Sequence, residues 1–415
     1  MSSSRTVARR ISLNTPRITP RLGVVRPFST TVLRPVHQSQ TQTQTNTNTH
    51  QAQTNAYQRT TTRGYASIPN MQTIKNSIAE NFGGPVSKLG SHQWTLEQCP
   101  DLSGKVAVVT GGSEGIGFGV TYTLLKNNTS KIFILSKDVD VVKGAKEVIA
   151  KELGQDKADR TVWWECDLAD WKHTKDVAEK IKKDTDRLDI LCNNAGRGIM
   201  TAQLTDAGVD RHMAVNHFGH VVLTSHLLPL IKKTAEAGHT VRIACQASNA
   251  HQGAPKGTKF ESVEEINKDE GPNGQYGRSK LANILYARYM DRNVTQRGHG
   301  KVLFNATHPG FVSTRQSKEA IHEPYPLGGY AVSVLMEPFK KDQFEGCVPM
   351  VYAVTVADKG GQYICPPAVP EEGTEMSQSI ELQDNLMKLT RKVVSEKTKP
   401  DSVDKGCPFD DLVFH

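Results

Sequence analysis

The 415-residue sequence predicts an α/β fold in which a doubly wound parallel sheet of about seven strands carries helices on both faces. Two observations lead to this prediction. From about Asp101 onward, short apolar runs alternate with segments of helical periodicity, which is the pattern of successive βαβ units. A glycine-rich turn, Thr110–Gly117, directly follows the first apolar run, and in such sheets ligands lie at the carboxyl ends of the strands.

Six short apolar runs are expected to form buried parallel strands, and a seventh is a candidate. In chain order they span Lys105–Thr110, Lys131–Ser136, Thr161–Cys166, Leu188–Cys192, Val241–Cys245, Lys301–Thr307 and Gly361–Cys365, the last being the candidate. Amphipathic segments lie between them, near residues 115–126, 139–153, 170–184, 220–233 and 276–297. Right-handed crossovers through these segments give a single doubly wound sheet.

The first 65 residues differ in composition from the rest of the chain. They contain nine arginines, no lysine and no acidic residue. The net charge of +8 belongs to this leader, because the remainder carries 42 basic and 43 acidic side chains. An arginine- and hydroxyl-rich, acid-free leader is typical of a mitochondrial transit peptide. A basic tail on a cytoplasmic protein is the alternative. The balanced remainder removes most of the support for a nucleic-acid partner, which would require the leader to remain attached.

Two segments of the leader resemble matrix-processing sites, one ending at Phe28 and one at Tyr65. Between them, His37–Thr62 is dominated by Gln, Thr and Asn, which cannot bury enough apolar surface to fold. No run of about 18 apolar residues occurs, so no membrane-spanning helix is expected. The predicted organisation is a transit peptide with a low-complexity segment over 1–65, a linker over 66–100, one α/β domain over 101–392 and a charged tail over 393–415.

The cysteines and histidines do not predict a metal site. The seven cysteines are scattered and never in Cys-x-x-Cys spacing, which also argues against a disulfide framework. Three of them lie in strand-like runs and are expected in the core: Cys166, Cys192 and Cys245. Three histidines near the proposed cleft lack the spacing of metal ligands and are expected to pack: His217, His220 and His251.

The glycines of the first turn predict a Rossmann-type dinucleotide site. Gly111, Gly115 and Gly117 allow a tight turn and the close approach of a pyrophosphate to a helix N-terminus. At the end of the second strand, where an NAD enzyme carries an acid, the sequence has Ser136-Lys137. A hydroxyl and a cation suit a 2′-phosphate, so NADP(H) is favoured over NAD(H). The following Asp138 leaves this preference open, as does the reading of Lys137 as a solvated lysine.

Tyr276 and Lys280 predict acid–base chemistry. Residues four apart share one face of a helix, so the ammonium can lie beside the phenol. A free phenol has a pKa of about 10, and a neighbouring cation favours its ionised form. A phenol of this kind beside a dinucleotide site predicts hydride transfer to or from a carbonyl.

Together these motifs resemble the short-chain dehydrogenase/reductase family. Asp167-Leu168, Asn193-Asn-Ala-Gly196, Asn216, Ser248 and Pro309-Gly310 occur in the family's order, and the resemblance covers roughly residues 101–365. The wording Asn-His-Phe-Gly-His at 216–220 and Ser-Asn-Ala-His at 248–251 is most similar to the branch of retinol dehydrogenases and WW-domain oxidoreductases. No WW domain is visible in the sequence.

The resemblance implies a role for each catalytic residue. Tyr276 would donate a proton to the developing alkoxide and act as base in the reverse direction. Lys280 would lower the pKa of Tyr276 and hold the nicotinamide ribose. Ser248 would stabilise the substrate oxygen, and Asn216 would anchor a water that links Lys280 to solvent.

The resemblance also implies a set of cofactor contacts. Asp167 and Leu168 would flank the adenine, and Val312 and Thr314 would meet the nicotinamide carboxamide. The full set is Gly111, Ser113, Gly115, Ile116, Gly117, Lys137, Asp167, Leu168, Asn194, Ala195, Gly196, Tyr276, Lys280, Pro309, Gly310, Val312 and Thr314.

One departure from the family concerns Ala247, which takes the place of a first, non-catalytic serine before Ser248. A slip of this registration by one residue would leave no catalytic hydroxyl. A second region of interest is the apolar stretch Tyr325–Phe339, which is expected to form a substrate lid. Its composition suggests a lipophilic substrate, with an ordinary surface helix as the alternative.

These observations predict a mitochondrial, matrix-located NADP(H)-dependent oxidoreductase that interconverts a lipophilic aldehyde or ketone and its alcohol. A 3-oxoacyl or steroid reductase would use the same residues. A non-catalytic dinucleotide-binding mitochondrial subunit is the alternative from another class, although all four catalytic residues are retained. A homo-oligomer through residues 206–233 and 276–297 and a peripheral membrane contact stay open.

Overall fold

The computed structural model describes residues 94–310, 312 and 342–398. Several predictions lie outside these residues. They concern the transit peptide, most of the linker, Thr314, the apolar stretch Tyr325–Phe339 and the end of the charged tail.

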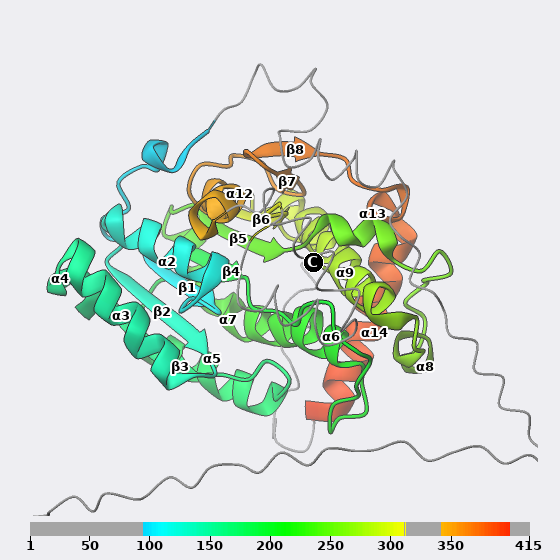
Figure 1. The fold of residues 1–415 in the computed structure, drawn as a ribbon. Helices are drawn as coiled ribbons and strands as arrows, with labels where there is room; N and C mark the ends of the chain where they lie inside the picture. The colour runs from blue at the N-terminus through cyan, green and yellow to red at the C-terminus, as the bar shows by residue number, and fades with distance from the viewer. Residues whose placement is uncertain (1–93, 311, 313–341, 399–415) are drawn as a thin grey trace, which may run out of the picture. The chain divides into compact units, whose positions relative to one another are not determined.

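The described residues form one eight-stranded sheet in the order β3-β2-β1-β4-β5-β6-β7-β8 (Figure 1). The strands are β1 (Val106–Thr110), β2 (Lys131–Ser136), β3 (Thr161–Glu165), β4 (Ile190–Asn193), β5 (Val241–Gln246), β6 (Val302–Thr307), β7 (Tyr363–Cys365) and β8 (Val369–Glu371). The first seven pair in parallel, and β8 pairs antiparallel with β7. The doubly wound parallel sheet is therefore confirmed, and β8 was not predicted.

Helices connect the strands and cover the sheet. The α-helices are α2 (Gly115–Lys126), α3 (Val139–Leu153), α4 (Gln155–Asp159), α5 (Trp171–Asp184), α6 (Arg211–Met213), α7 (Gly219–Glu236), α8 (Val263–Asn267), α9 (Gly271–Asn293), α12 (Gln343–Thr355), α13 (Glu375–Gln378) and α14 (Ile380–Thr398). Short 3-10 turns form η1 (Leu96–Gln98), η3 (Asn249–Gly253) and η4 (Thr295–Arg297), and a π-helical turn forms η2 (Ala214–Phe218).

Alternate residues of each strand enter two different cores, so the sheet is buried on both faces. Val106 and Val108 of β1 face the core that includes side chains of α5, α7, α9 and α14. Ala107 and Val109 face the opposite core, which includes side chains of α2, α3 and α12. Burial on both faces explains why the strands are continuous apolar runs rather than alternating ones.

The three cysteines that were expected in the core are buried. Burial raises the pKa of Cys166 to about 11 and that of Cys245 to about 12, so both thiols stay protonated at neutral pH. The six cysteines among the described residues are free thiols. None of the described helices is both long enough and apolar enough to cross a membrane.

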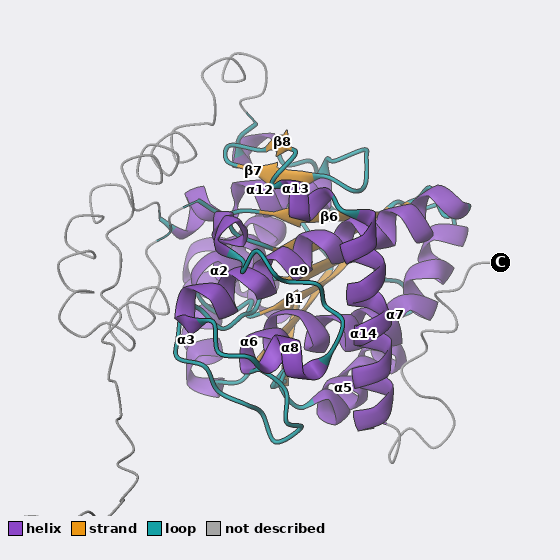
Figure 2. Cartoon of the chain, turned by 90° about the vertical axis from the view of Figure 1, so that its right-hand side faces the viewer, coloured by secondary structure: helices purple, strands orange, loops and turns teal. Residues whose placement is uncertain are grey.

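The domain does not end at Lys392 as expected, because α14 continues to Thr398. Val393 and Val394 are buried in the same core as α9. The helix packs against α9 and α5 (Figure 2). The sequence analysis ended the domain too early because this segment is rich in charged residues. The apolar residues of α14 that pack in the core are few.

Replacing Leu386, which is fully buried, tests whether α14 belongs to the folded core. We expect Leu386→Ala to lower the free energy of unfolding by about 2–5 kcal/mol, because it removes buried methyl groups and leaves a cavity. Lys388→Ala changes an exposed residue of the same helix and is expected to stay within about 0.5 kcal/mol of wild type. Equal effects of the two substitutions in urea unfolding would contradict the placement of α14.

Candidate active site

The glycine-rich turn joins β1 to α2 and has no room for side chains at its centre. Gly111 and Gly115 have positive φ angles of 63° and 54°. A Cβ atom on Gly117 would lie 2.0 Å from the carbonyl oxygen of Gly111, so only glycine fits there. This contact draws the start of α2 up to the end of β1. The free N–H groups of the first helical turn then face the cleft, where an anion is stabilised.

A cleft of about 430 Å³ opens beside this turn, between the carboxyl ends of β1 and β4 where the strand order reverses. It is lined by most of the predicted cofactor residues: Gly111, Ser113, Gly115, Ile116, Gly117, Lys137, Asp167, Leu168, Asn194, Ala195, Gly196, Tyr276, Lys280 and Pro309. Gly310 and Val312 are not among its lining residues, and the methyl groups of Val312 instead pack at Gly346.

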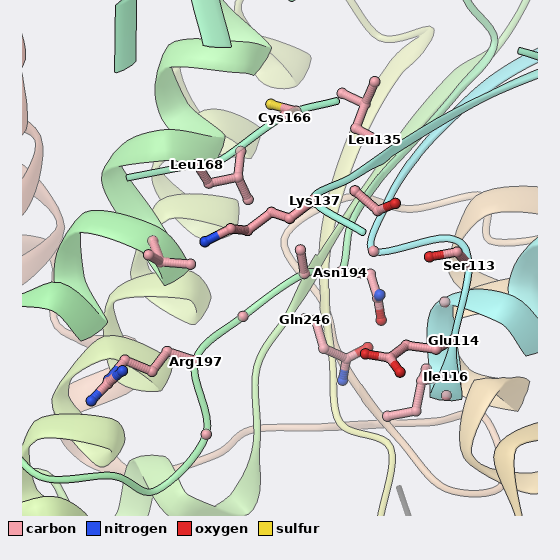
Figure 3. A pocket seen from close by; sticks show the side chains of 18 of the residues that line it. Ser113, Glu114, Ile116, Leu135, Lys137, Cys166, Leu168, Asn194, Arg197 and Gln246 are labelled. Atoms are coloured by element: carbon pink, nitrogen blue, oxygen red, sulfur yellow. The ribbon is translucent and has the colours of Figure 1, made fainter. Parts of the chain in front are cut away.

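Other lining residues were not predicted, among them Glu114, Arg197 and Gln246. Figure 3 shows Glu114, Asn194 and Gln246 grouped in the cleft, with Lys137 reaching toward Leu168. Glu114 lies inside the glycine-rich turn and Arg197 directly follows the Asn-Asn-Ala-Gly motif, so their place in the chain was the available signal. Nothing in the sequence pointed to Gln246 as a cleft residue, because it belongs to no motif of the dinucleotide site.

Lys137 and Asp138 point in different directions at the end of β2. Lys137 Nζ lies 2.7 Å from Asp167 Oδ2, and its side chain is 61% exposed. Burial acts to raise the pKa of Asp167, but the bond to Lys137 and the N–H of Ala169 hold it below its ordinary value. Asp138 instead caps α3, since its Oδ1 accepts from the backbone N–H groups of Asp140 and Val141 at 3.0 and 3.2 Å. Residues 135–141 contribute to one wall of the cleft, and Lys137 is the only cationic residue among them.

Tyr276 and Ser248 meet at the inner end of the cleft. Burial raises the pKa of Tyr276 to about 12, and a hydrogen bond with Ser248 opposes this shift. Ser248 follows β5 and caps η3, with its Oγ accepting from the N–H of Ala250 at 3.2 Å. The hydroxyl next to the phenol is thus that of Ser248. This geometry is consistent with the alignment that makes Ser248 the catalytic serine and Ala247 the replacement of the non-catalytic one.

Lys280 lies one helical turn after Tyr276 on α9, but its ammonium is not at the phenol oxygen. Its Nζ lies 5.4 Å from the centre of the Tyr276 ring and donates to the carbonyl oxygen of Gln246 at 2.9 Å. Burial lowers the pKa of Lys280 to about 8. The expected lowering of the Tyr276 pKa by Lys280 is not found in this structure, in which burial raises that pKa and only the bond with Ser248 opposes the rise.

Asn216 lies in the π-helical turn η2, next to Gly196. Its Oδ1 accepts from the backbone N–H of Arg197 at 2.6 Å, and its Nδ2 donates to the Arg197 carbonyl at 3.0 Å and to Ser279 Oγ at 2.8 Å. A Cβ atom on Gly196 would lie 3.0 Å from Asn216 Oδ1 and 3.4 Å from Lys280 Nζ. Gly196 is thus the point at which the Asn216 amide, the Lys280 ammonium and the loop after β4 converge.

The three histidines near the cleft are buried and pack as expected. Burial lowers the pKa of His217 to about 3 and that of His220 to about 4, and it also lowers the pKa of His251. His217 Nε2 contacts Thr390 Oγ1 of α14 at 2.9 Å. Within residues 94–310, 312 and 342–398, no group of three or more His, Cys, Asp or Glu side chains is arranged to hold a metal ion.

A glycine-rich turn, a switch-point cleft and a Tyr–Lys pair on one helix together define a dinucleotide-dependent class of oxidoreductase fold. The family model for short chain dehydrogenases matches residues 105–259. A Neurospora crassa protein named "Putative oxidoreductase bli-4, mitochondrial" is 65% identical over 364 residues, which cover 86% of this chain and 88% of that protein. The chain belongs to the short-chain dehydrogenase family.

More distant relatives share the same domain. Retinol dehydrogenase 14 of Mus musculus is 29% identical over 271 residues, covering 63% of this chain and 76% of its own. Polyprenol dehydrogenase of Homo sapiens is 29% identical over 222 residues, covering 52% and 61%. A crystal structure of a Mycobacterium paratuberculosis protein superposes with a TM-score of 0.56 at 21% identity, covering 73% of this chain and 97% of that one. This last similarity supports the fold alone.

Gly117→Ala tests the close contact that forms the turn. We expect this variant to lose about 1–3 kcal/mol of unfolding free energy, because its Cβ overlaps a backbone carbonyl that cannot move cheaply. Gly144→Ala is the matched control, since nothing lies within 4 Å of a Cβ at this position on α3. The control should gain about 0.5–1 kcal/mol from its lower chain entropy when unfolded. A stabilised Gly117→Ala protein would overturn the description of the turn.

Proposed function

We propose that the protein is an NADP(H)-dependent oxidoreductase that interconverts a lipophilic aldehyde or ketone and its alcohol. The observation that carries this proposal is the meeting of Tyr276, Ser248 and Lys280 at the inner end of the cleft. Tyr276 and Lys280 line the same cleft as the glycine-rich turn, although more than a hundred residues separate them from it in sequence.

The residues of the cleft fit a nicotinamide dinucleotide. The absence of any side chain at Gly111, Gly115 and Gly117 leaves the helix N-terminus open to a pyrophosphate. Asp167 and Leu168 would flank the adenine, and Lys280 would hold the nicotinamide ribose. When bound, the nicotinamide supplies or accepts the hydride.

The proton is the contribution of the chain itself. With a pKa of about 12, the Tyr276 hydroxyl keeps its proton at neutral pH and can donate it to the oxygen of a carbonyl being reduced. Ser248 would hydrogen-bond the same oxygen and stabilise its growing charge. In the reverse direction Tyr276 must first lose its proton, which the ammonium of Lys280 would favour once it moves from Gln246 toward the ribose. Asn216 would hold the water through which Lys280 exchanges protons with solvent.

The preference for NADP(H) is supported by the end of β2. Lys137 lines the cleft and is 61% exposed, so its ammonium can contact a 2′-phosphate although it also pairs with Asp167. Asp138 is occupied by the N-terminus of α3 and does not offer its carboxylate to a ribose. The charge arrangement thus favours the phosphorylated cofactor over NAD(H).

A lipophilic substrate and a mitochondrial location are supported by composition and by the names of relatives. Two relatives are named for retinol and polyprenol, both of which are lipophilic alcohols. The apolar composition of Tyr325–Phe339 points the same way. The acid-free leader and the relative named as mitochondrial both favour the mitochondrion, with the matrix as its proposed compartment.

Tyr276→Phe tests the proposed chemistry. We expect turnover to fall at least about 100-fold, because general acid–base catalysis contributes about 10²–10⁴-fold, while NADPH affinity stays within about threefold of wild type. The measurement is NADPH oxidation by purified protein with a panel of lipophilic aldehydes and ketones, acyl and steroid substrates included. Tyr289→Phe on the same helix loses only a contact with Arg391 and serves as the control. Turnover within threefold of wild type would exclude Tyr276 as the acid.

Lys137→Glu tests the cofactor preference. We expect the ratio of kcat/KM for NADPH to that for NADH to fall at least tenfold, because a carboxylate repels the 2′-phosphate and accepts hydrogen bonds from a ribose. Lys143→Glu makes the same charge change on α3, at an exposed residue outside the cleft lining, and should leave the ratio unchanged. An unchanged ratio for Lys137→Glu would show that Lys137 does not contact the 2′-phosphate.

A further inference from the structure

His220 lies between the two parts of the site, although the proposed chemistry does not use it. It is the second residue of α7, directly after the π-helical turn that carries Asn216, and it is 3% exposed. Its Nε2 lies 2.9 Å from Thr110 Oγ1 at the end of β1. Its Nδ1 lies 3.1 Å from the carbonyl oxygen of Asn216. One imidazole therefore bridges the dinucleotide cleft and the turn of Asn216.

The chemistry of the two contacts fixes the proton on the imidazole. A carbonyl oxygen can only accept, so the Nδ1 of His220 must carry the hydrogen and donate it to Asn216. Burial keeps the ring neutral, and its Nε2 is then an acceptor. The hydroxyl of Thr110 must therefore donate its single proton to Nε2, which lies closer than its other acceptor, the Cys192 carbonyl at 3.2 Å.

The buried Thr110 hydroxyl lies behind the cleft wall and bonds to two residues that line the cleft. With its proton given to His220, its oxygen accepts the backbone N–H groups of Asn194 and Ala195, both at 2.9 Å. The Asn194 side chain donates in addition to the Thr110 carbonyl at 2.9 Å. Asn194 and Ala195 line the cleft. The orientation of the Thr110 hydroxyl therefore affects the position of the backbone at these two residues.

The other contact acts on the turn that carries Asn216. Here the N–H of Gly219 bonds to the carbonyl of Ala214, five residues back, instead of the four of an α-helix. A Cβ at Gly219 would lie 2.3 Å from the Leu168 carbonyl, so this turn is pressed against the cleft wall and cannot relax outward. The His220 ring holds the Asn216 carbonyl in this turn, while the Asn216 amide reaches Arg197 and Ser279.

We propose that His220 is a positioning residue that couples the dinucleotide cleft to Asn216, with Nε2 orienting the Thr110 hydroxyl and Nδ1 holding the Asn216 carbonyl. This proposal rests on the proposed function, since it assigns the first contact to cofactor binding and the second to turnover. A change at one contact reaches the other through a rigid five-membered ring.

Two substitutions separate the two contacts. Gln places a polar atom near the position of the histidine Nε2, so His220→Gln keeps an acceptor for Thr110 and loses the donor to Asn216. Asn places one near Nδ1, so His220→Asn keeps the donor to Asn216 and loses the acceptor for Thr110. His226→Gln on the same helix is the control, because His226 contacts Glu179 of α5 and neither part of the site.

We expect opposite patterns in the two variants. His220→Asn should weaken NADPH binding about three- to tenfold, the range for the loss of one hydrogen bond, with turnover at saturating NADPH within about twofold of wild type. His220→Gln should keep NADPH binding within about twofold and lower turnover about three- to tenfold. The measurements are fluorescence titration with NADPH and single-substrate kinetics with a carbonyl that the wild type reduces. Binding and turnover falling together in both variants, in step with the melting temperature, would overturn the proposal and leave a packing role.

Amide hydrogen exchange tests the same coupling without turnover. The amides of Asn194 and Ala195 should exchange faster in His220→Asn only, and those of residues 214–219 faster in His220→Gln only. Equal changes in both variants would contradict the coupling. If wild type binds neither NADPH nor NADH, the proposed function fails, while the exchange pattern still decides whether His220 couples the two segments.

Discussion

The contact between Gly117 and the carbonyl of Gly111 is the constraint on which the site depends. It allows α2 to begin immediately beyond β1, so that free backbone N–H groups face a cleft whose floor is the edge of a parallel sheet. The other walls follow from the strand order, because β2 and β4 lie on either side of β1 and end at the same edge. Residues distant in sequence, such as Lys137 and Asn194, therefore reach one cleft without any long loop of their own.

Burial, more than pairwise charge, determines the electrostatics at the inner end of this cleft. It raises the pKa of Tyr276 and lowers that of Lys280, so both neutral forms are favoured. The ammonium is satisfied by the carbonyl of Gln246, to which Asn283 also donates at 2.9 Å. The protein thus holds a protonated phenol and a lysine whose pKa burial lowers to about 8. A ligand that brings hydroxyl groups or charge into the cleft alters both groups at once.

Sequence patterns predicted the sheet well because buried parallel strands are short, apolar and separated by helical periodicity. They missed β8, whose three residues include Pro370 and pair only at the sheet edge. They also missed α12, which contains Pro349, a residue that usually ends helices. In the site, motif spacing located Tyr276, Lys280 and the cleft glycines. Spacing could not predict that Lys280 bonds to Gln246, because the direction of a long side chain depends on packing between distant segments.

The burial of α14 has a consequence for how the domain forms during synthesis. The helix shares a buried core with α9, and Thr390 contacts His217 in the turn of Asn216. A ribosome releases the chain from its N-terminus, so the strands and α9 emerge while this core still lacks α14. Until α14 is synthesised and packs, the nascent domain exposes a hydrophobic surface of the kind that chaperones bind. Premature termination before residue 380 would make that transient exposure permanent and mark the product for proteolysis.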